Sequence, residues 1–169
     1  MGVRSVKEDK NIYFASRENA GLTRESAAEQ MECISADRIY KIETGKALPH
    51  PDEVLLMAEC YKNPSMCNFY CSHECEIGQK YVPEIKVKDL PAITLEMLAT
   101  LNNLQKSKDR LIEISADGEL TEDEMPDFLS IQDSLNKMSL AIDALKLWVN
   151  NAVATGRIDG TVLEDIKAE

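Results

Sequence analysis

The chain has 169 residues and a hydrophobic content of 44%, enough to fill one ordinary domain or two small ones, which excludes disorder of the whole chain. Aromatic residues make up only 5%, and Gly and Pro are few, so the composition favours an all-α protein. The net charge of −11 argues against nonspecific adhesion to nucleic acid or anionic lipid. No stretch approaches the roughly 20 apolar residues that cross a bilayer, and the first residues lack the apolar core of a secretory signal. We therefore expect a cytoplasmic protein without membrane contact.

Residues 10–77 contain short helical segments separated by turn signals, with almost no alternation of the strand type. This pattern predicts a compact multi-helix domain over residues 1–79. Within it, Thr23 is positioned to cap one short helix and Ser35 to cap a second. Because only a few residues separate these two helices, they must cross sharply. Small Ala28 fits the crossing point, and the apolar residues of both helices supply the inner faces.

The order of these motifs resembles the XRE family of phage-repressor-type helix-turn-helix proteins, which are bacterial regulators. The resemblance covers roughly the first 40% of the chain and extends beyond the two central helices; it rests on residues 17–23, 22–31, 35–46, 49–53 and 56–58. It implies a five-helix N-terminal domain that binds double-stranded DNA, with residues 36–43 entering the major groove. One departure is the turn at residues 32–35, which is one residue longer than is usual in the family and lacks glycine. We therefore expect the helix that follows to start or tilt differently.

The resemblance also assigns roles to individual side chains. Arg38 is the first candidate for contact with a base edge, and Arg24 and Lys46 match positions that touch the DNA backbone. Arg17 and Glu43 match a pair that bridges the first and third helices, so we expect a structural role for both. The complete set of expected DNA-binding residues is Arg24, Ser35, Ala36, Asp37, Arg38, Tyr40, Lys41 and Lys46.

A cluster of cysteines follows the helix-turn-helix segment. Cys67 and Cys71 are four residues apart and share one helix face, which Cys75 can extend. Three of these thiolates with His73 or Cys60 suffice in number for a tetrahedral zinc site, and the candidate ligands are Cys67, Cys71, His73 and Cys75. However, the spacing differs from paired Cys-x-x-Cys sites, and neighbouring aromatic residues favour thiols packed in a core. For the same reason Cys33, in the turn, is expected to be a core residue. No other cofactor is implied.

Residues 80–91 contain two prolines and several β-branched residues, so we expect an extended linker that separates two domains. Beyond it, residues 92–169 are expected to form a helical hairpin with a short terminal helix. The first long helix is predicted over residues 92–115, and the second is predicted to start between 122 and 126. Apolar residues of the second helix alternate at spacings of three and four, as in helices that pack side by side: Phe128, Ile131, Leu135, Met138, Ile142, Leu145, Val149 and Ala152. The terminal helix is expected after Gly160.

A two-helix hairpin buries little apolar surface by itself, so we expect it to pack against a second copy, which gives a homodimer, or against the N-terminal domain. This part of the chain is thus expected to be an assembly or sensing domain. The sequence contains no nucleophile with a matched base and no glycine-rich phosphate loop, and we expect no enzyme. The first hypothesis is a sequence-specific, dimeric DNA-binding transcriptional regulator. The alternatives are a protein-interaction module that does not bind DNA, and a regulator that responds to thiol chemistry or metal through the cysteine cluster.

Overall fold

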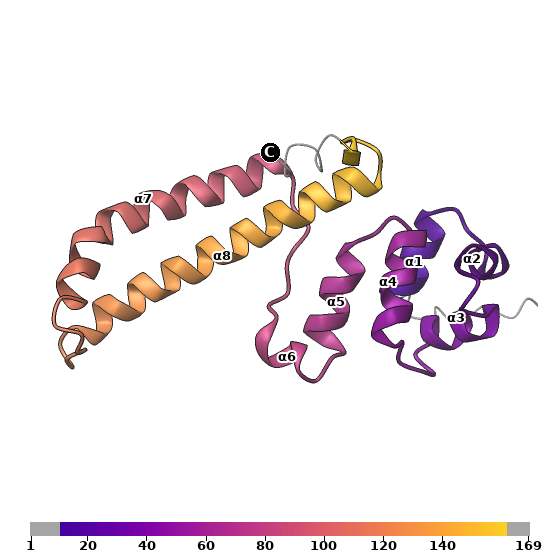
Figure 1. Cartoon of the computed structure of the whole chain (residues 1–169), viewed down its shortest axis with the longest axis horizontal. Coiled ribbons are helices and arrows are strands. Elements are labelled where there is room, and N and C mark those ends of the chain that lie inside the picture. Colours follow the sequence, from indigo (N-terminus) through magenta and orange to yellow (C-terminus); the bar gives the residue numbers. More distant parts are fainter. Residues whose placement is uncertain (1–10, 162–169) are drawn as a thin grey trace, which may run out of the picture. The chain divides into compact units, whose positions relative to one another are not determined.

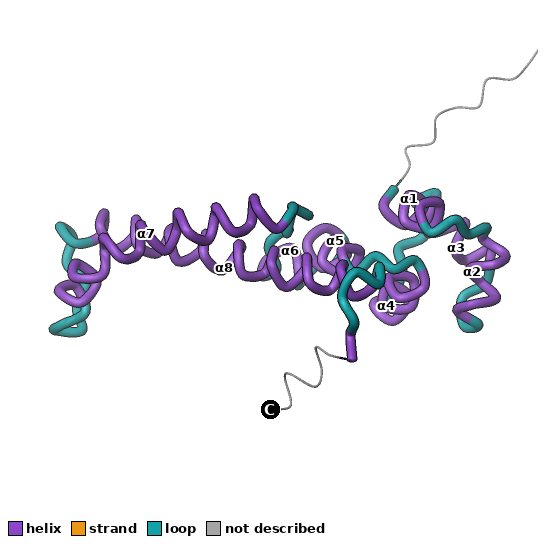
Figure 2. The backbone as a smooth tube through the Cα atoms, turned by 90° about the horizontal axis from the view of Figure 1, so that it is seen from above, coloured by secondary structure: helices purple, strands orange, loops and turns teal. Residues whose placement is uncertain are grey.

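A computed structural model describes residues 11–161, which contain eight α-helices and no strand (Figure 1; helices purple in Figure 2). The prediction of an all-α protein with an N-terminal helix-turn-helix domain and long C-terminal helices is confirmed. Within the described residues, no helix combines the length and the apolar character needed to span a membrane. The helices are α1 (Ile12–Asn19), α2 (Arg24–Met31), α3 (Ala36–Glu43), α4 (Pro51–Cys60), α5 (Ser65–His73), α6 (Gly78–Tyr81), α7 (Leu90–Ile114) and α8 (Met125–Ala154).

The chain divides into two compact units. The described part of the first unit covers residues 11–84 and 150–161, and the second unit is Ile85–Val149. The division therefore falls between α6 and α7 on one side and near the end of α8 on the other. Residues 82–89 are neither helix nor strand. The extents of the two predicted domains and their linker stay predictions.

Side-chain caps set where the first three helices begin. The side chains of Asn11, Thr23 and Ser35 accept hydrogen bonds from backbone N–H groups in the first turns of α1, α2 and α3. The predicted caps at Thr23 and Ser35 are thus confirmed. The helices enclose a core whose largest fully buried members come from α1, α3, α4 and α5: Tyr13, Ile39, Ile42, Val54, Met57 and Met66. Because two isoleucines of α3 are buried at its inner face, the opposite face of α3 is directed outward.

The turn between α2 and α3 contains a residue with positive φ, although it has no glycine. Glu32 has a φ of 57°, in the left-handed region that glycine favours. Ile34 is buried and holds the turn against the core, whereas Cys33 is exposed. The expectation that Cys33 is a core residue is therefore wrong, because the turn directs the side chain after Glu32 into solvent.

The second unit is built around the hairpin of α7 and α8, which run side by side in opposite directions (Figures 1 and 2). α7 starts two residues before the predicted position, because the Asp89 side chain caps it and Pro91 lies in the first turn, where a missing N–H costs nothing. α8 starts at Met125, within the predicted interval. Near the turn, Arg110 of α7 and Asp127 of α8 form an ion pair of 2.8 Å.

The helix face that α8 buries differs partly from the predicted stripe. Ile131 is buried, whereas Leu135 and Ile142 are 48% and 39% exposed within one chain, so the packing of the whole stripe stays a prediction. One neighbouring helix covers only a narrow strip of a partner, and the predicted stripe is wider than that strip. The short helix expected after Gly160 falls mostly on residues 162–169, outside the described residues; Gly160 and Thr161 are helical.

Candidate nucleic-acid interface

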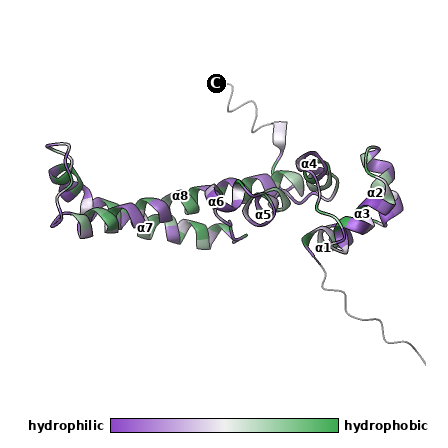
Figure 3. Cartoon of the chain, turned by 90° about the horizontal axis from the view of Figure 1, so that it is seen from below, coloured by the Kyte–Doolittle hydropathy of each residue, from purple (hydrophilic) through white to green (hydrophobic). Residues whose placement is uncertain are grey.

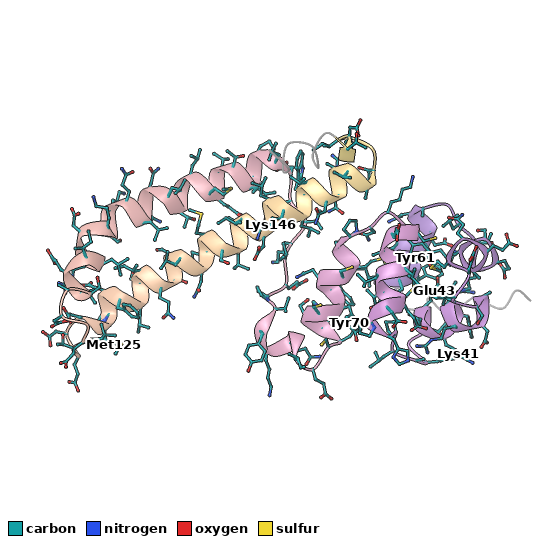
Figure 4. The ribbon with its side chains drawn as sticks, viewed as in Figure 1. Lys41, Glu43, Tyr61, Tyr70, Met125 and Lys146 are labelled. Atoms are coloured by element: carbon teal, nitrogen blue, oxygen red, sulfur yellow. The ribbon has the colours of Figure 1, made fainter. Side chains whose placement is uncertain are left out.

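The outer face of α3 carries most of the residues that the sequence assigned to DNA. Ser35 caps the helix through its hydroxyl, which accepts from the Arg38 backbone N–H at 3.2 Å. Ala36 and Asp37 follow in the first turn, where backbone N–H groups give the helix start a partial positive charge. Lys41 and Glu43 lie on different sides of α3: Lys41 is exposed, and Glu43 is buried among the neighbouring helices (Figure 4).

The side chain of Lys41 forms a weak, exposed ion pair. Its Nζ lies 2.6 Å from Oδ2 of Asp37, one helical turn earlier, and the two side chains are 50% and 69% exposed. An exposed pair with this spacing contributes only about 0.3–0.5 kcal/mol. Lys41 can therefore leave Asp37 for another acceptor at little cost.

Arg38 is held much more firmly. Its Nε and Nη2 donate to the two carboxylate oxygens of Glu53, each at 2.7 Å, and Nη2 also donates to the backbone carbonyl of Leu48 at 2.9 Å. These bonds tie α3 to the start of α4, where the Glu53 carboxylate also accepts from the His50 N–H. The Arg38 guanidinium thus lowers the pKa of Glu53. Three of the five N–H donors of Arg38 are therefore used inside the domain.

A second basic group surrounds Tyr40. The guanidinium carbon of Arg24 lies 5.1 Å from the centroid of the Tyr40 ring, and Nζ of Lys46 lies 4.5 Å from it. The Lys46 ammonium also donates to the Tyr40 hydroxyl at 2.8 Å. Cations favour such positions over an aromatic face. The Tyr40 ring therefore holds together two of the residues that were expected to contact the DNA backbone.

Arg24 is anchored on its inner side by Glu43. The Glu43 carboxylate accepts from Nε of Arg24 at 2.7 Å and from Nε of Arg17 at 2.6 Å. The Glu43 side chain is 1% exposed and that of Arg17 is 5% exposed. This confirms the predicted bridge between Arg17 and Glu43, and hydrogen bonding to Glu43 raises the pKa of Arg17. The carboxylate thus connects α1, α2 and α3 beneath the outer surface.

The candidate zinc ligands lie in and just after α5. Among residues 11–161, no three His, Cys, Asp or Glu side chains come together as a group that could hold a metal ion, so the geometry gives the zinc hypothesis no support. All five cysteines are free, and the ring of His73 stacks on Phe69 with centroids 4.5 Å apart. Burial raises the pKa of Cys60 and Cys67, which lowers the thiolate fraction needed for reactivity.

Glu53 is the residue that sequence reasoning missed. Its only local signal is the capping-box spacing from His50 at the start of α4, which says nothing about Arg38. The contact joins residues 15 positions apart on two helices, and only the packing of α3 against α4 brings them together.

Replacing Glu53 with glutamine should make stability less dependent on pH. The folded pKa of Glu53 lies below the unfolded value, about 4.3, so its contribution is present above that value and is lost as pH falls through the folded pKa. Urea unfolding at pH 7 should show a loss of about 1–2 kcal/mol in Glu53→Gln, and the gap from wild type should narrow toward pH 3. Glu29→Gln, at an exposed position of α2, is the control. A gap that stays constant with pH would contradict the ion pair.

Comparison with known proteins bears on the segment just described. Residues 15–64 match a family model described as a helix-turn-helix domain, and this match spans most of α1 together with α2, α3 and α4. Neither a curated protein nor a solved structure matches the chain. The helix-turn-helix domain thus contains α3, the Arg38–Glu53 pair and the basic group around Tyr40.

Proposed function

We propose that this chain is a cytoplasmic, sequence-specific DNA-binding transcriptional regulator of the XRE type, acting as a homodimer assembled through its C-terminal helices. α3 enters the major groove, and each copy reads one half of a two-fold site. The observation that carries this proposal is the arrangement of Arg24, Tyr40 and Lys46 beside the outer face of α3. Two cations fixed on one aromatic ring form a local basic surface on a chain whose net charge is −11.

In this proposal Arg24 and Lys46 contact phosphates on the two sides of the groove. Glu43 and Tyr40 hold them in place before DNA arrives, which lowers the entropy lost on binding. Ser35 and Ala36 bring the start of α3 close to the sugar-phosphate backbone, where its N–H groups favour an anion.

The base contacts fall to the residues of α3 that can move. Lys41 leaves the exposed Asp37 at a cost of about 0.3–0.5 kcal/mol, whereas Arg38 would have to break a bidentate pair with Glu53. We therefore assign base reading first to Lys41, with Asp37 and Tyr40 beside it. Arg38 contributes through its Nη1 edge while Glu53 holds its orientation.

Fluorescence anisotropy on duplexes selected from a random library tests these roles. Lys41→Ala should weaken binding to the preferred duplex by about 1–3 kcal/mol and leave binding to unrelated duplexes nearly unchanged. Arg24→Ala should weaken binding to all duplexes by a similar factor. It should also reduce the slope of log affinity against log salt concentration by about 1. Lys106→Ala, an exposed lysine of α7, is the control and should change neither quantity.

A second candidate function is a protein-interaction module that does not meet DNA. The exposed Asp37 on α3 and the exposed Glu25, Glu29 and Glu32 on and after α2 favour it, because they weaken the positive potential of this face. The same anisotropy experiment separates the two functions. Selection that enriches no duplex, together with no salt-dependent binding, would reject DNA binding and favour the interaction module.

A further inference from the structure

The α7–α8 hairpin carries two matching stripes of exposed residues. Each stripe advances by three and four residues in turn, so its members share one side of their helix. Five of the ten side chains are large and aliphatic, with 39–60% of their surface exposed. The stripe on α7 is Leu98, Leu101, Gln105, Lys108 and Ile112, and the stripe on α8 is Gln132, Leu135, Ser139, Ile142 and Lys146. Together we name them the acid-free face.

Both stripes lie on the same side of the hairpin. On α7, the stripe residues Leu101 and Lys108 each follow a half-buried residue, Met97 or Leu104, by four positions. On α8, Leu135 and Ile142 likewise follow Ile131 and Met138, which are buried and half-buried, by four positions. The two helices are antiparallel, so equal displacements from the shared contact line turn both stripes toward one side. Both helices carry hydrophobic as well as hydrophilic stretches along their length (Figure 3).

The charges of the hairpin are distributed unevenly around it. Every Asp and Glu of residues 85–149 lies outside the acid-free face, although this segment is acidic overall. The opposite side carries mixed charges in solvated ion pairs, such as Lys137 with Asp133 and Arg110 with Glu113. The two lysines of the acid-free face already reach carboxylates at its rim, since Lys108 pairs with Asp109 and Lys146 with Asp143.

We propose that the acid-free face packs against the acid-free face of a second copy, so that α7 and α8 of two chains form a four-helix bundle. This rests on the dimeric regulator proposed above and names the surface that assembles it. Two copies of an acidic hairpin repel each other except where carboxylates are absent. A two-fold axis parallel to the helices would place α7 of one copy over α8 of the other. A surface that is apolar on both helices is complementary to itself in that arrangement.

The size of the face fits a stable dimer. α7 has 25 residues and is therefore about 37 Å long, and two adjacent helices are roughly 20 Å wide. Each copy contributes roughly 700 Å², so two copies bury about 1,400 Å², within the range of specific interfaces. A contact of this area would also bury the leucines and isoleucines that the hairpin alone leaves exposed.

Light scattering of the full chain tests the proposal. Wild type at about 20 µM should have twice the mass of one chain, and Leu135→Glu combined with Ile142→Glu should raise the dissociation constant at least about 100-fold, because two unpaired charges cannot be buried. Asn103→Glu combined with Ser130→Glu adds the same charges on the opposite side and should remain dimeric. Circular dichroism confirms that each variant keeps its helices. A photo-crosslinking residue at Ser139 should capture a second copy, and one at Ser130 should not.

A monomeric wild type, equal dissociation of both double variants, or crosslinking from Ser130 instead of Ser139 would overturn the proposal. Crosslinking to another site of the same chain would show that the face is covered internally. The outcome is distinct from that of the DNA experiment: a dimer broken only by Leu135→Glu and Ile142→Glu, in a chain that binds no DNA, supports this surface and rejects the regulator. Specific DNA binding by a monomer would support the DNA-binding regulator and reject this dimer surface.

Discussion

Replacing Glu43 with alanine is expected to destabilise the N-terminal unit by about 3–5 kcal/mol, which is a large part of the stability of a small domain. The reason is the guanidinium of Arg17, whose side chain is only 5% exposed and which would lose its buried carboxylate partner and keep only the half-exposed Glu18. Arg24 would lose its inner anchor at the same time. Thermal unfolding followed by circular dichroism should show a melting temperature lowered by at least roughly 12 °C.

Two further variants show whether the effect comes from the stranded charge. Combining Glu43→Leu with Arg17→Met removes both buried charges and should recover much of the lost stability, because apolar side chains can replace a buried ion pair at little cost. Arg24→Ala leaves the Arg17–Glu43 pair in place, and should cost about 1 kcal/mol or less because its partner keeps a cation. If the double variant were as unstable as Glu43→Ala, the stranded-charge explanation would be incorrect.

The features that could be predicted from sequence are those with local signals. Thr23 and Ser35 cap their helices because a hydroxyl before a helical run satisfies backbone N–H groups within three residues. The start of α8 followed from the same kind of local pattern. The bridge between Arg17 and Glu43 spans 26 residues and was expected only through the resemblance to a family that has a pair at these positions.

The features that were missed depend on packing between helices. Arg38 and Glu53 are both polar residues of ordinary helices, and nothing near either one indicates the other. The Tyr40 ring meets Lys46 because Gly45 takes a positive φ after α3 and turns the chain back. Leu135 and Ile142 fit a stripe that packs against other helices, but the pattern does not say which helices cover these two residues, and one chain leaves them exposed.

Replacing Gly78 with alanine is expected to separate α6 from α5. A methyl group at this position would lie 1.9 Å from the backbone carbonyl oxygen of Cys71, far inside contact distance, and backbone atoms cannot rotate away as a side chain can. Overpacking of this kind costs about 1–3 kcal/mol, more than alanine gains in helix propensity. Hydrogen exchange should therefore become faster in α6, beginning with the N–H of Val82, which donates to the Gly78 carbonyl.

The matched control for this substitution is Lys80→Ala, which also places alanine in α6 but at an exposed position. Its exchange rates in α6 should stay close to those of wild type, because no backbone atom has to move. The contact with Cys71 also predicts that the effect is local: α1, α2 and α3 are packed around Ile39 and Ile42, and their protection should persist in Gly78→Ala. Unchanged exchange across α6 in Gly78→Ala would mean that α5 and α6 are not held at the observed separation in solution.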